Sequence, residues 1–379
     1  MRRLVALVSV IVFADTMLFS AIVPLVPAFV DDYGLSKLQA GLLVGAYGAG
    51  AMVGGIPAGL AAARVGPKRT VVAGLATLTV SSIAFALVGS PEALGATRFV
   101  QGLSSAVTWS GALAWLTLDT PRERRGQILG TAFGFAVLGF IVGPVVGAIG
   151  ELTSLEAVFL VVAAASALLA LAAASFPAGR SDLRDPGSVG RALRDLPFVL
   201  AVWLTLVPAL FFGVLDLLVP LSLDGSGWGP VAIAATFVAA GLVEVALAPL
   251  VGGFSDRRGR VSLIRSGLAL LAAVSIGLAL ASPPLLVAAL VVGASLAATG
   301  IYTPGMALIS DRAEARRMPQ TLAFGIMNSA WAIGAMTGPA AGGALASTAG
   351  DAAPYLACAA VAGVTLLLVD RLRLEARTA

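Results

Sequence analysis

Long uninterrupted apolar runs are the feature that most limits what this chain can fold into. Each run is roughly 20 to 28 residues long, and a helix needs about 20 apolar residues to cross a hydrocarbon core of about 30 Å. Strands of a membrane β-barrel would instead alternate in polarity over about ten residues. We therefore predict an all-α membrane protein with twelve transmembrane helices, at residues 4–30, 38–62, 70–90, 93–117, 126–150, 155–176, 197–223, 229–254, 261–281, 284–309, 320–347 and 352–370.

Missing and rare residue types exclude several classes of function. Only 12% of the 379 residues are charged, against about 25% in a soluble domain, so a water-soluble protein is excluded. The chain has no histidine, and Cys358 is its only cysteine. A zinc site, an iron–sulfur cluster, a disulfide framework and a Ser-His-Asp triad are therefore excluded, and we predict no metal and no cofactor. No phosphate-binding G-x-x-x-x-G-K-[ST] motif is present, so no ATP-driven motor of that type is predicted.

The positions of the cationic side chains predict how the chain is oriented. Lysine and arginine accumulate in the cytoplasmic segments of helical membrane proteins. Of the 24 lysines and arginines, all except Lys37 and Arg98 fall in segments that the twelve spans place on one side, together with both termini. We assign that side to the cytoplasm and the protein to the cell membrane as a multi-pass protein. The net charge of +4 thus reflects topology, and no nucleic-acid partner is predicted.

Two motifs occur twice, which predicts a duplicated chain. Glycines and an arginine that follow the second span recur after the eighth, 193 positions later, and a Gly-Pro pattern in the fifth span recurs in the eleventh, 195 positions later. The first motif comprises Gly59, Arg64 and Gly66, then Gly252, Asp256, Arg257 and Gly259; the second comprises Gly139, Gly143, Pro144 and Gly147, then Gly334, Gly338, Pro339 and Gly342. We predict six-helix bundles at 1–176 and 196–379, joined by a cytoplasmic linker at 177–195. Such repeats are typical of secondary transporters that bind substrate between the halves near the bilayer midplane.

These halves, the linker and the motifs resemble the major facilitator superfamily, specifically its twelve-span drug–proton antiporter branch. The segment after each second span resembles the family loop G-x-x-x-D-R-x-G-R-R/K, although Ala63 replaces the aspartate in the first copy. The resemblance implies the major facilitator fold, a monomer, and a conformational role for both motifs. For the Gly-Pro motif it implies exchange rather than symport; the alternative is a packing kink alone.

The fourth span carries a further signature, from Arg98 to Ala106, that matches the family pattern R-x-x-Q-G-x-x-x-A. In the family this arginine is implicated in proton transfer, whereas the alternative is an arginine that extends to the outer interface. Asp15, followed by Pro24 and Pro27, resembles a first-span element of the same branch. In the seventh span, Asp216 with Pro220 resembles that element more loosely.

Four ionisable residues inside the spans are the proton-coupling candidates: Asp15, Arg98, Asp216 and Glu244. An uncompensated charge at the bilayer centre costs at least about 2.5–3.5 kcal/mol, which makes each a functional hypothesis. At 1.5 Å per residue, Asp15 lies about 18 Å from one end of its span and about 24 Å from the other, and Glu244 is similarly deep. Burial favours the neutral carboxyl, so such a group can take up a proton on one side and release it on the other. The alternatives are a structural hydrogen bond for Asp15 and Glu244, and an interfacial position for Asp216.

Polar and aromatic residues in the spans are the candidates for a substrate cavity. They are Gln101, Trp109, Phe212, Tyr302, Asn328 and Trp331, with Trp115, Trp203 and Phe211 as further aromatic candidates. A largely apolar, aromatic pocket suits lipophilic molecules, including cations if Glu244 or Asp15 faces it. The alternative is that these rings only pack or lie at the membrane interface.

Together these features predict a secondary transporter that exports a small organic solute in exchange for protons. Its predicted partners are that solute, protons and the lipid bilayer. Two alternatives remain: a proton symporter or facilitator for a sugar or metabolite, and, from another class, a non-transporting membrane sensor or assembly protein. A membrane enzyme is disfavoured because the chain has no histidine and no clustered nucleophile and base.

Overall fold

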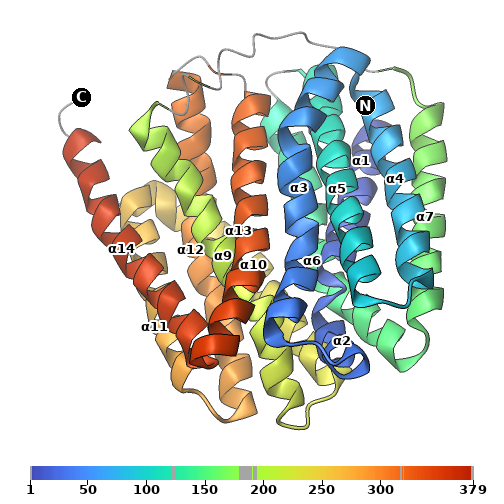
Figure 1. Ribbon diagram of the computed structural model, residues 1–379. Coiled ribbons are helices and arrows are strands. Elements are labelled where there is room, and N and C mark those ends of the chain that lie inside the picture. The colour runs from blue at the N-terminus through green and yellow to red at the C-terminus, as the bar shows by residue number, and fades with distance from the viewer. Residues whose placement is uncertain are drawn as a thin grey trace. The chain divides into compact units, whose positions relative to one another are not determined.

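The computed structural model describes residues 2–121, 124–178, 190, 194–315, 318 and 320–376. Helices dominate this part of the chain, which contains no strand, and the predicted all-α fold is confirmed (Figure 1). The helices are α1 (Arg2–Ser20), η1 (Val23–Leu25), α2 (Val26–Tyr33), α3 (Lys37–Val65), α4 (Pro67–Leu87), α5 (Pro91–Asp119), α6 (Arg125–Leu152), α7 (Leu155–Ser175), α9 (Leu196–Asp224), α10 (Pro230–Arg258), α11 (Arg260–Leu280), α12 (Pro284–Ala315), α13 (Gln320–Ala349) and α14 (Ala352–Ala376).

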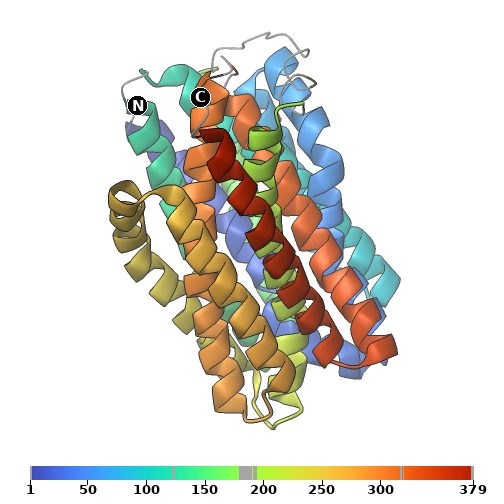
Figure 2. The same cartoon turned by 90° about the vertical axis from the view of Figure 1, so that its left-hand side faces the viewer.

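The chain divides into two compact units. The first comprises Met1–Gly34 and Leu42–Pro186, and the second comprises Leu35–Gly41 and Gly187–Ala379. In the first unit α1 packs against α6, and α4 packs against both α5 and α7. In the second unit α9 packs against α13, and α11 packs against both α12 and α14; Figure 2 shows these last three helices side by side. The same pairs of helices therefore meet in each unit.

The first predicted span is not one continuous helix. It consists of α1, the single turn η1 and α2, with Pro24 in η1 and Pro27 at the start of α2. Proline lacks the backbone N–H that a helix interior requires and clashes with the preceding turn, so the two prolines explain the break. The carbonyl groups at the end of α1 are consequently available to side chains of other helices.

The turn between α3 and α4 and the turn between α10 and α11 each require glycine. Gly66 precedes α4 with φ of 90°, and Gly259 precedes α11 with φ of 87°. Side chains rarely tolerate this backbone region because of the Cβ atom, whereas glycine enters it freely. The two glycines are equivalent positions of the repeated motif, 193 residues apart.

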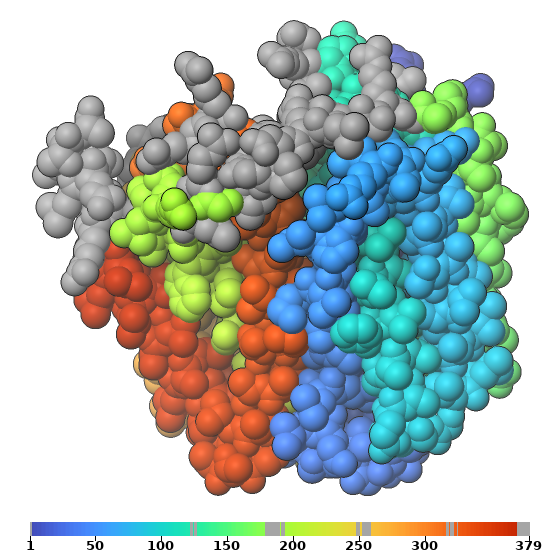
Figure 3. Space-filling view, turned by 45° about the horizontal axis from the view of Figure 1, so that its top comes forward, coloured from blue at the N-terminus to red at the C-terminus, as the bar shows by residue number. Residues whose placement is uncertain are grey.

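The outer faces of the helices are apolar, as lipid contact requires. Leu171 and Val161 of α7 are 69% and 68% exposed, and Val80 of α4 is 68% exposed. Ten helical segments in the described part of the chain are long and apolar enough to cross a membrane; α5 and α13 are not among them, and both are rich in glycine and small polar residues. The outer surfaces of α3 and α4, in blue, lie on the face drawn in Figure 3.

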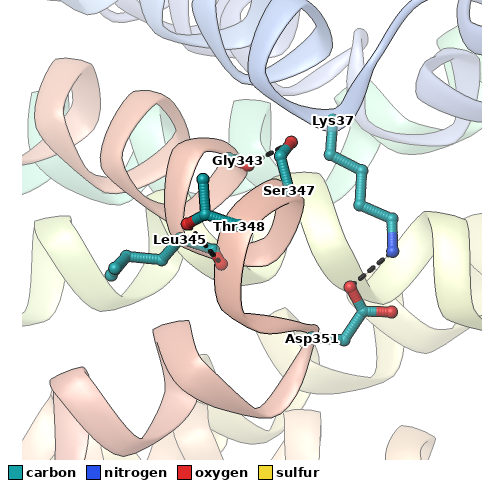
Figure 4. Close-up of polar contacts among 6 residues, drawn as sticks. All are labelled: Lys37, Gly343, Leu345, Ser347, Thr348 and Asp351. Atoms are coloured by element: carbon teal, nitrogen blue, oxygen red, sulfur yellow. Dashed lines mark hydrogen bonds and ion pairs between the residues drawn. The ribbon is translucent and has the colours of Figure 1, made fainter.

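The beginning of α3 belongs to the second unit and is attached to the end of α13. The Lys37 ammonium donates to the Asp351 carboxylate at 2.5 Å, between residues that are both predicted to lie outside the membrane (Figure 4). A Cβ built on Gly343 would lie within 3.0 Å of the Lys37 carbonyl oxygen. Only glycine therefore allows this close approach, whereas the exposed ion pair itself adds little stability.

Candidate functional site

One carboxylate, that of Asp15 on α1, is buried in the first unit with only 2% of its surface exposed. Its Oδ2 atom accepts three hydrogen bonds, from the Tyr47 hydroxyl at 3.2 Å, the Ser105 hydroxyl at 2.6 Å and the Trp109 indole N–H at 2.8 Å. Its Oδ1 atom accepts no hydrogen bond from the described residues. All three donors are electrically neutral, so they stabilise a carboxylate without cancelling its charge.

Two helices supply the donors to Asp15. Ser105 and Trp109 lie one helical turn apart on α5 and therefore share a face, while Tyr47 comes from α3. Gly102, the glycine of the Arg98 motif, permits the contact between α3 and α5, because a Cβ there would lie within 3.0 Å of the Tyr47 carbonyl oxygen. The motif glycine thus determines how closely the tyrosine approaches Asp15.

Arg98 is fully buried on α5. Its Nη1 atom donates to the Leu18 carbonyl at 3.2 Å and to Gln101 Oε1 at 3.1 Å, and Nη2 donates to the Phe19 carbonyl at 3.1 Å. Those carbonyls belong to the last turn of α1, where the helix dipole favours a cation. Arg98 therefore lies among buried acceptors and not at the outer interface.

Asp15 and Arg98 form no direct ion pair; Tyr47 lies between them. Its hydroxyl donates to Asp15, and the guanidinium carbon of Arg98 lies 4.8 Å from the centre of its ring. A cation over an aromatic face is a favourable contact. The two charges are therefore linked through the Tyr47 side chain and not by a direct contact.

Gln101 is enclosed and does not line an open cavity. It is fully buried, accepts from Arg98, and donates to the Ser82 hydroxyl at 3.5 Å. Its cavity assignment is therefore corrected: the side chain orients Arg98. Trp109 is partly exposed and stacks at 5.7 Å from Phe133 of α6, so it remains a cavity candidate.

Sequence reasoning did not identify Tyr47 as part of the site. It is the only ionisable residue within the middle of an otherwise apolar and glycine-rich span. A buried tyrosine hydroxyl usually has a hydrogen-bond partner, and this was the available signal. Which partner it has depends on the packing of α3 against α1 and α5.

The Gly-Pro motif of α6 packs directly on α1. A Cβ on Gly139 or Gly143 would lie within 3.0 Å of a backbone oxygen of α1, and one on Gly147 would lie equally close to the carbonyl oxygen of Ala21, directly after α1. Two hydrogen bonds also join α1 and α6 along this contact, which we call the seam: the Thr16 hydroxyl donates to the Ala136 carbonyl at 2.8 Å, and the Ser20 hydroxyl donates to the Phe140 carbonyl at 3.2 Å. The motif therefore joins the helix that carries Asp15 to α6.

The second unit repeats this packing with apolar side chains. A Cβ on Gly334 would approach Ala209 of α9, and one on Gly338 would approach Gly213. These α9 residues lie 193 positions after Thr16 and Ser20, and the same separation relates the contact of Gly74 with Ser104 to that of Gly267 with Ala297. The helices thus pack in equivalent registers, but the hydroxyls are missing from the second seam.

In this register the polar cluster has no counterpart in the second unit. Asp15, Tyr47, Arg98, Gln101, Ser105 and Trp109 correspond to Pro208, Ala240, Val291, Ala294, Ala298 and Tyr302. Pro220 matches Pro27, as predicted, but Asp216 matches Val23 and is not the equivalent of Asp15. The units share a backbone plan and differ in their polar residues.

The second unit has its own ionisable groups. Glu244 on α10 and Asp216 on α9 are both partly exposed, and Tyr302 lies on α12, which packs against α10. The remaining cavity candidates of this unit, Phe212, Asn328 and Trp331, are also partly exposed. These residues have surface available for a ligand.

Three further aromatic candidates are used in packing. Trp115 and Phe211 are at most 1% exposed, and the Trp203 indole donates to the Thr365 hydroxyl of α14 at 3.0 Å. Because Trp115 and Phe211 are fully buried, neither lines a cavity surface in this structure, and their assignment as cavity residues is corrected.

The repeated glycine–arginine motif is only partly described. In the first copy Arg64 is exposed, and a Cβ on Gly59 would meet nothing within 4 Å. In the second copy, the side-chain surroundings of Gly252, Asp256 and Arg257 lie outside the described part of the structure. No group of three or more metal-ligating side chains occurs among the described residues.

The helices of this chain are long and apolar enough to span a membrane, they pair in the same way in both units, and the first unit encloses a carboxylate. This combination agrees with a polytopic membrane transporter. A family model described as the Major Facilitator Superfamily matches residues 8–323, and the chain belongs to this family.

Relatives and a solved structure agree with this assignment. The chain is 27% identical over 143 residues to the MFS-type transporter ppzB of Metarhizium majus, covering 36% of this chain and 31% of the relative. It is 27% identical over 126 residues to the quinolone resistance protein NorA of Staphylococcus aureus, covering 33% and 32%. Each match spans about a third of the relative's length. The crystal structure of a bacterial homologue of the human lysosomal transporter Spinster matches with a TM-score of 0.82 and 15% identity, covering 99% of this chain and 98% of that chain, which supports the fold alone.

Proposed function

We propose that this major facilitator protein exports a small, lipophilic organic solute in exchange for protons by alternating access. The observation that carries the proposal is the buried Asp15 carboxylate, which has three neutral donors on one oxygen and none among the described residues on the other. Such a group changes its charge at modest energetic cost, because burial favours the neutral form while the donors favour the anion. Protonation then removes a charge that resists closure of the helices around it.

The second unit supports the solute side of the proposal. Glu244 and Tyr302 lie on the packed helices α10 and α12, and Phe212, Asn328 and Trp331 add partly exposed aromatic and amide surface. A carboxylate with aromatic rings suits a lipophilic cation, which gains both charge attraction and a ring face. The relative whose printed name is a quinolone resistance protein supports a drug-like solute.

Exchange is favoured over symport by the Gly-Pro motif. In the family its fifth-span copy is associated with antiport, and here Gly139 and Gly143 bring α6 against the helix that carries Asp15. A change in the charge of Asp15 therefore acts next to the seam along which α1 and α6 contact. A symporter or facilitator for a sugar or metabolite is the alternative that a transport assay distinguishes.

The proposal includes the organisation predicted from the sequence. The six-helix bundles at 1–176 and 196–379 would move as the alternating halves, with the 177–195 linker and both termini in the cytoplasm. The linker lies largely outside the described residues. The functional unit would be a monomer in the cell membrane.

The test is transport by purified protein in liposomes with an imposed pH gradient. Lipophilic cations, neutral drug-like molecules and sugars are offered in turn, and solute flux is measured together with proton flux. We expect opposite movement of protons and a lipophilic solute in the wild type, and loss of gradient-driven flux in Asp15→Asn. Asp32→Asn, which alters an exposed carboxylate of the same unit, serves as the matched control and should transport normally. Protons and solute moving in the same direction, or full coupling in Asp15→Asn, would contradict the proposal.

A further inference from the structure

We propose that Tyr47 is a positioning residue that transmits the charge state of Asp15 to Arg98. This inference rests on the proposed function, because it concerns how a proton on Asp15 alters the surrounding helices. Tyr47 is 1% exposed and is the one side chain in the described part of the first unit that contacts both charges, through its hydroxyl and through its ring.

Both contacts of Tyr47, with Asp15 and with Arg98, change when Asp15 gains or loses a proton. When Asp15 is ionised, the Tyr47 hydroxyl donates a charge-assisted hydrogen bond to Oδ2, which is stronger than a bond to a neutral acceptor. That bond orients the ring beneath the Arg98 guanidinium, 4.8 Å from its centre. Protonation of Asp15 weakens the bond and removes the negative charge that attracts Arg98 across the ring. The position of Arg98 thus depends on a carboxylate that it does not touch.

Packing confines the Tyr47 side chain, so a small shift of its ring changes its contacts with Asp15 and Arg98. Its ring meets that of Phe19 edge-on at 5.1 Å, and its backbone lies against Gly102 of α5, where no Cβ fits. Arg98 in turn binds the Leu18 and Phe19 carbonyls at the end of α1, the helix that also carries Asp15. A closed set of contacts therefore joins α1, α3 and α5. Neutralising Asp15 weakens two of these contacts together, the hydrogen bond from Tyr47 to Asp15 and the contact of Arg98 with the Tyr47 ring.

No other ionisable group of the packed helices occupies this position. Apart from Asp15, Tyr47 and Arg98, the ionisable residues of α1, α3, α4, α5, α6 and α7 lie near the helix ends: Arg2, Arg3, Lys37, Arg64, Lys68, Arg69, Glu92, Asp119, Arg125, Glu151 and Glu156. The second unit has Ala240 at the position equivalent to Tyr47 and Val291 at that of Arg98. The linkage is therefore confined to the first unit.

The experiment compares Tyr47→Phe, which removes only the hydroxyl, with Tyr47→Leu, which also removes the ring. Both are reconstituted in liposomes, and gradient-driven export is measured as a function of pH beside solute exchange at equal pH on both sides. Removing a donor from the carboxylate favours its neutral form, so in Tyr47→Phe the midpoint of the export profile should move up by about one pH unit. Tyr47→Leu should lose gradient-driven export at least about tenfold. Exchange at equal pH should persist in both. Tyr33→Phe, in α2 of the same unit, is the matched control and should keep the wild-type profile.

The outcomes separate this inference from the proposed function. A wild-type pH profile in Tyr47→Phe would overturn the role of the hydroxyl. Parallel loss of export, exchange and thermal stability in both variants would show a structural role only and would also overturn the inference. If Asp15→Asn stays fully coupled, the proposed function fails whatever Tyr47 does. If Asp15→Asn is uncoupled and Tyr47→Phe is normal, only the role of Tyr47 fails.

Discussion

At the scale of single residues, the molecule places its mid-membrane carboxylates in two different environments. Asp15 is enclosed by three neutral donors, whereas Glu244 is partly exposed on α10. An enclosed carboxylate suits a small ion such as a proton, while an accessible one can also bind part of a larger solute. The difference favours a proton-binding role for Asp15 and a solute-binding role for Glu244.

This difference leads to a prediction for Glu244→Gln. The change removes the charge and keeps the shape, so gradient-driven export of lipophilic cations should be abolished while the protein remains folded. Export of a neutral solute should continue, because it gains nothing from the charge. Liposome flux with a cation and a neutral analogue of similar size measures both. Undiminished export of the cation would remove Glu244 from the mechanism.

At the scale of helices, close approach is decided by glycine at a few positions. Along α6, Gly143 lies against α1, where a Cβ would come within 3.0 Å of the Met17 carbonyl oxygen, whereas Gly130 on the same helix has nothing within 4 Å. The Gly-Pro motif is therefore a packing surface as well as a site of backbone interruption by Pro144. Motif residues that look alike in sequence have different tolerances for substitution.

Alanine substitution of these two glycines tests that difference. Gly143→Ala should lower the thermal stability of the purified protein, since overpacking typically costs about 1–3 kcal/mol. Gly130→Ala should be neutral or slightly stabilising, because alanine has the higher helix propensity and fills open space. Thermal unfolding in the same detergent compares them. Equal stability of Gly143→Ala and the wild type would mean that α6 and α1 do not approach this closely.

At the scale of the whole molecule, the two units share their helix packing and differ in their polar side chains. The two units repeat helix pairings and glycine contacts at a separation of 193 residues, yet only the first contains the cluster around Asp15 and Arg98. A bundle that only maintained the fold would not need buried charges, which are costly in a membrane. The hydrogen-bonded cluster of Asp15, Tyr47 and Arg98 is present in the first unit and is not repeated at the equivalent positions of the second, which favours different roles for the two units.

The predicted orientation can be tested on intact cells with a membrane-impermeant thiol reagent. Cys358 is 3% exposed and can be replaced by alanine, which leaves a chain without cysteine. In that background, Ser226→Cys in a predicted outer loop should be labelled. Arg69→Cys at the start of α4 should be labelled only after the cells are opened. The reverse pattern would invert the topology.

The sequence by itself determined the all-helical fold class and the order of the apolar spans, and its repeated motifs indicated the family. Lipid requires every backbone polar group to be satisfied within a helix, so an apolar run of sufficient length has little choice of structure. It also identified Asp15 and Arg98, because charges inside such runs are conspicuous. Only the tertiary structure decided which side chains meet: it enclosed Gln101, buried Trp115 and Phe211, separated Asp216 from the repeat of Asp15, and put Tyr47 between two charges. Those outcomes depend on the rotation and approach of helices whose residues are far apart along the chain, and neither local apolarity nor spacing specifies them.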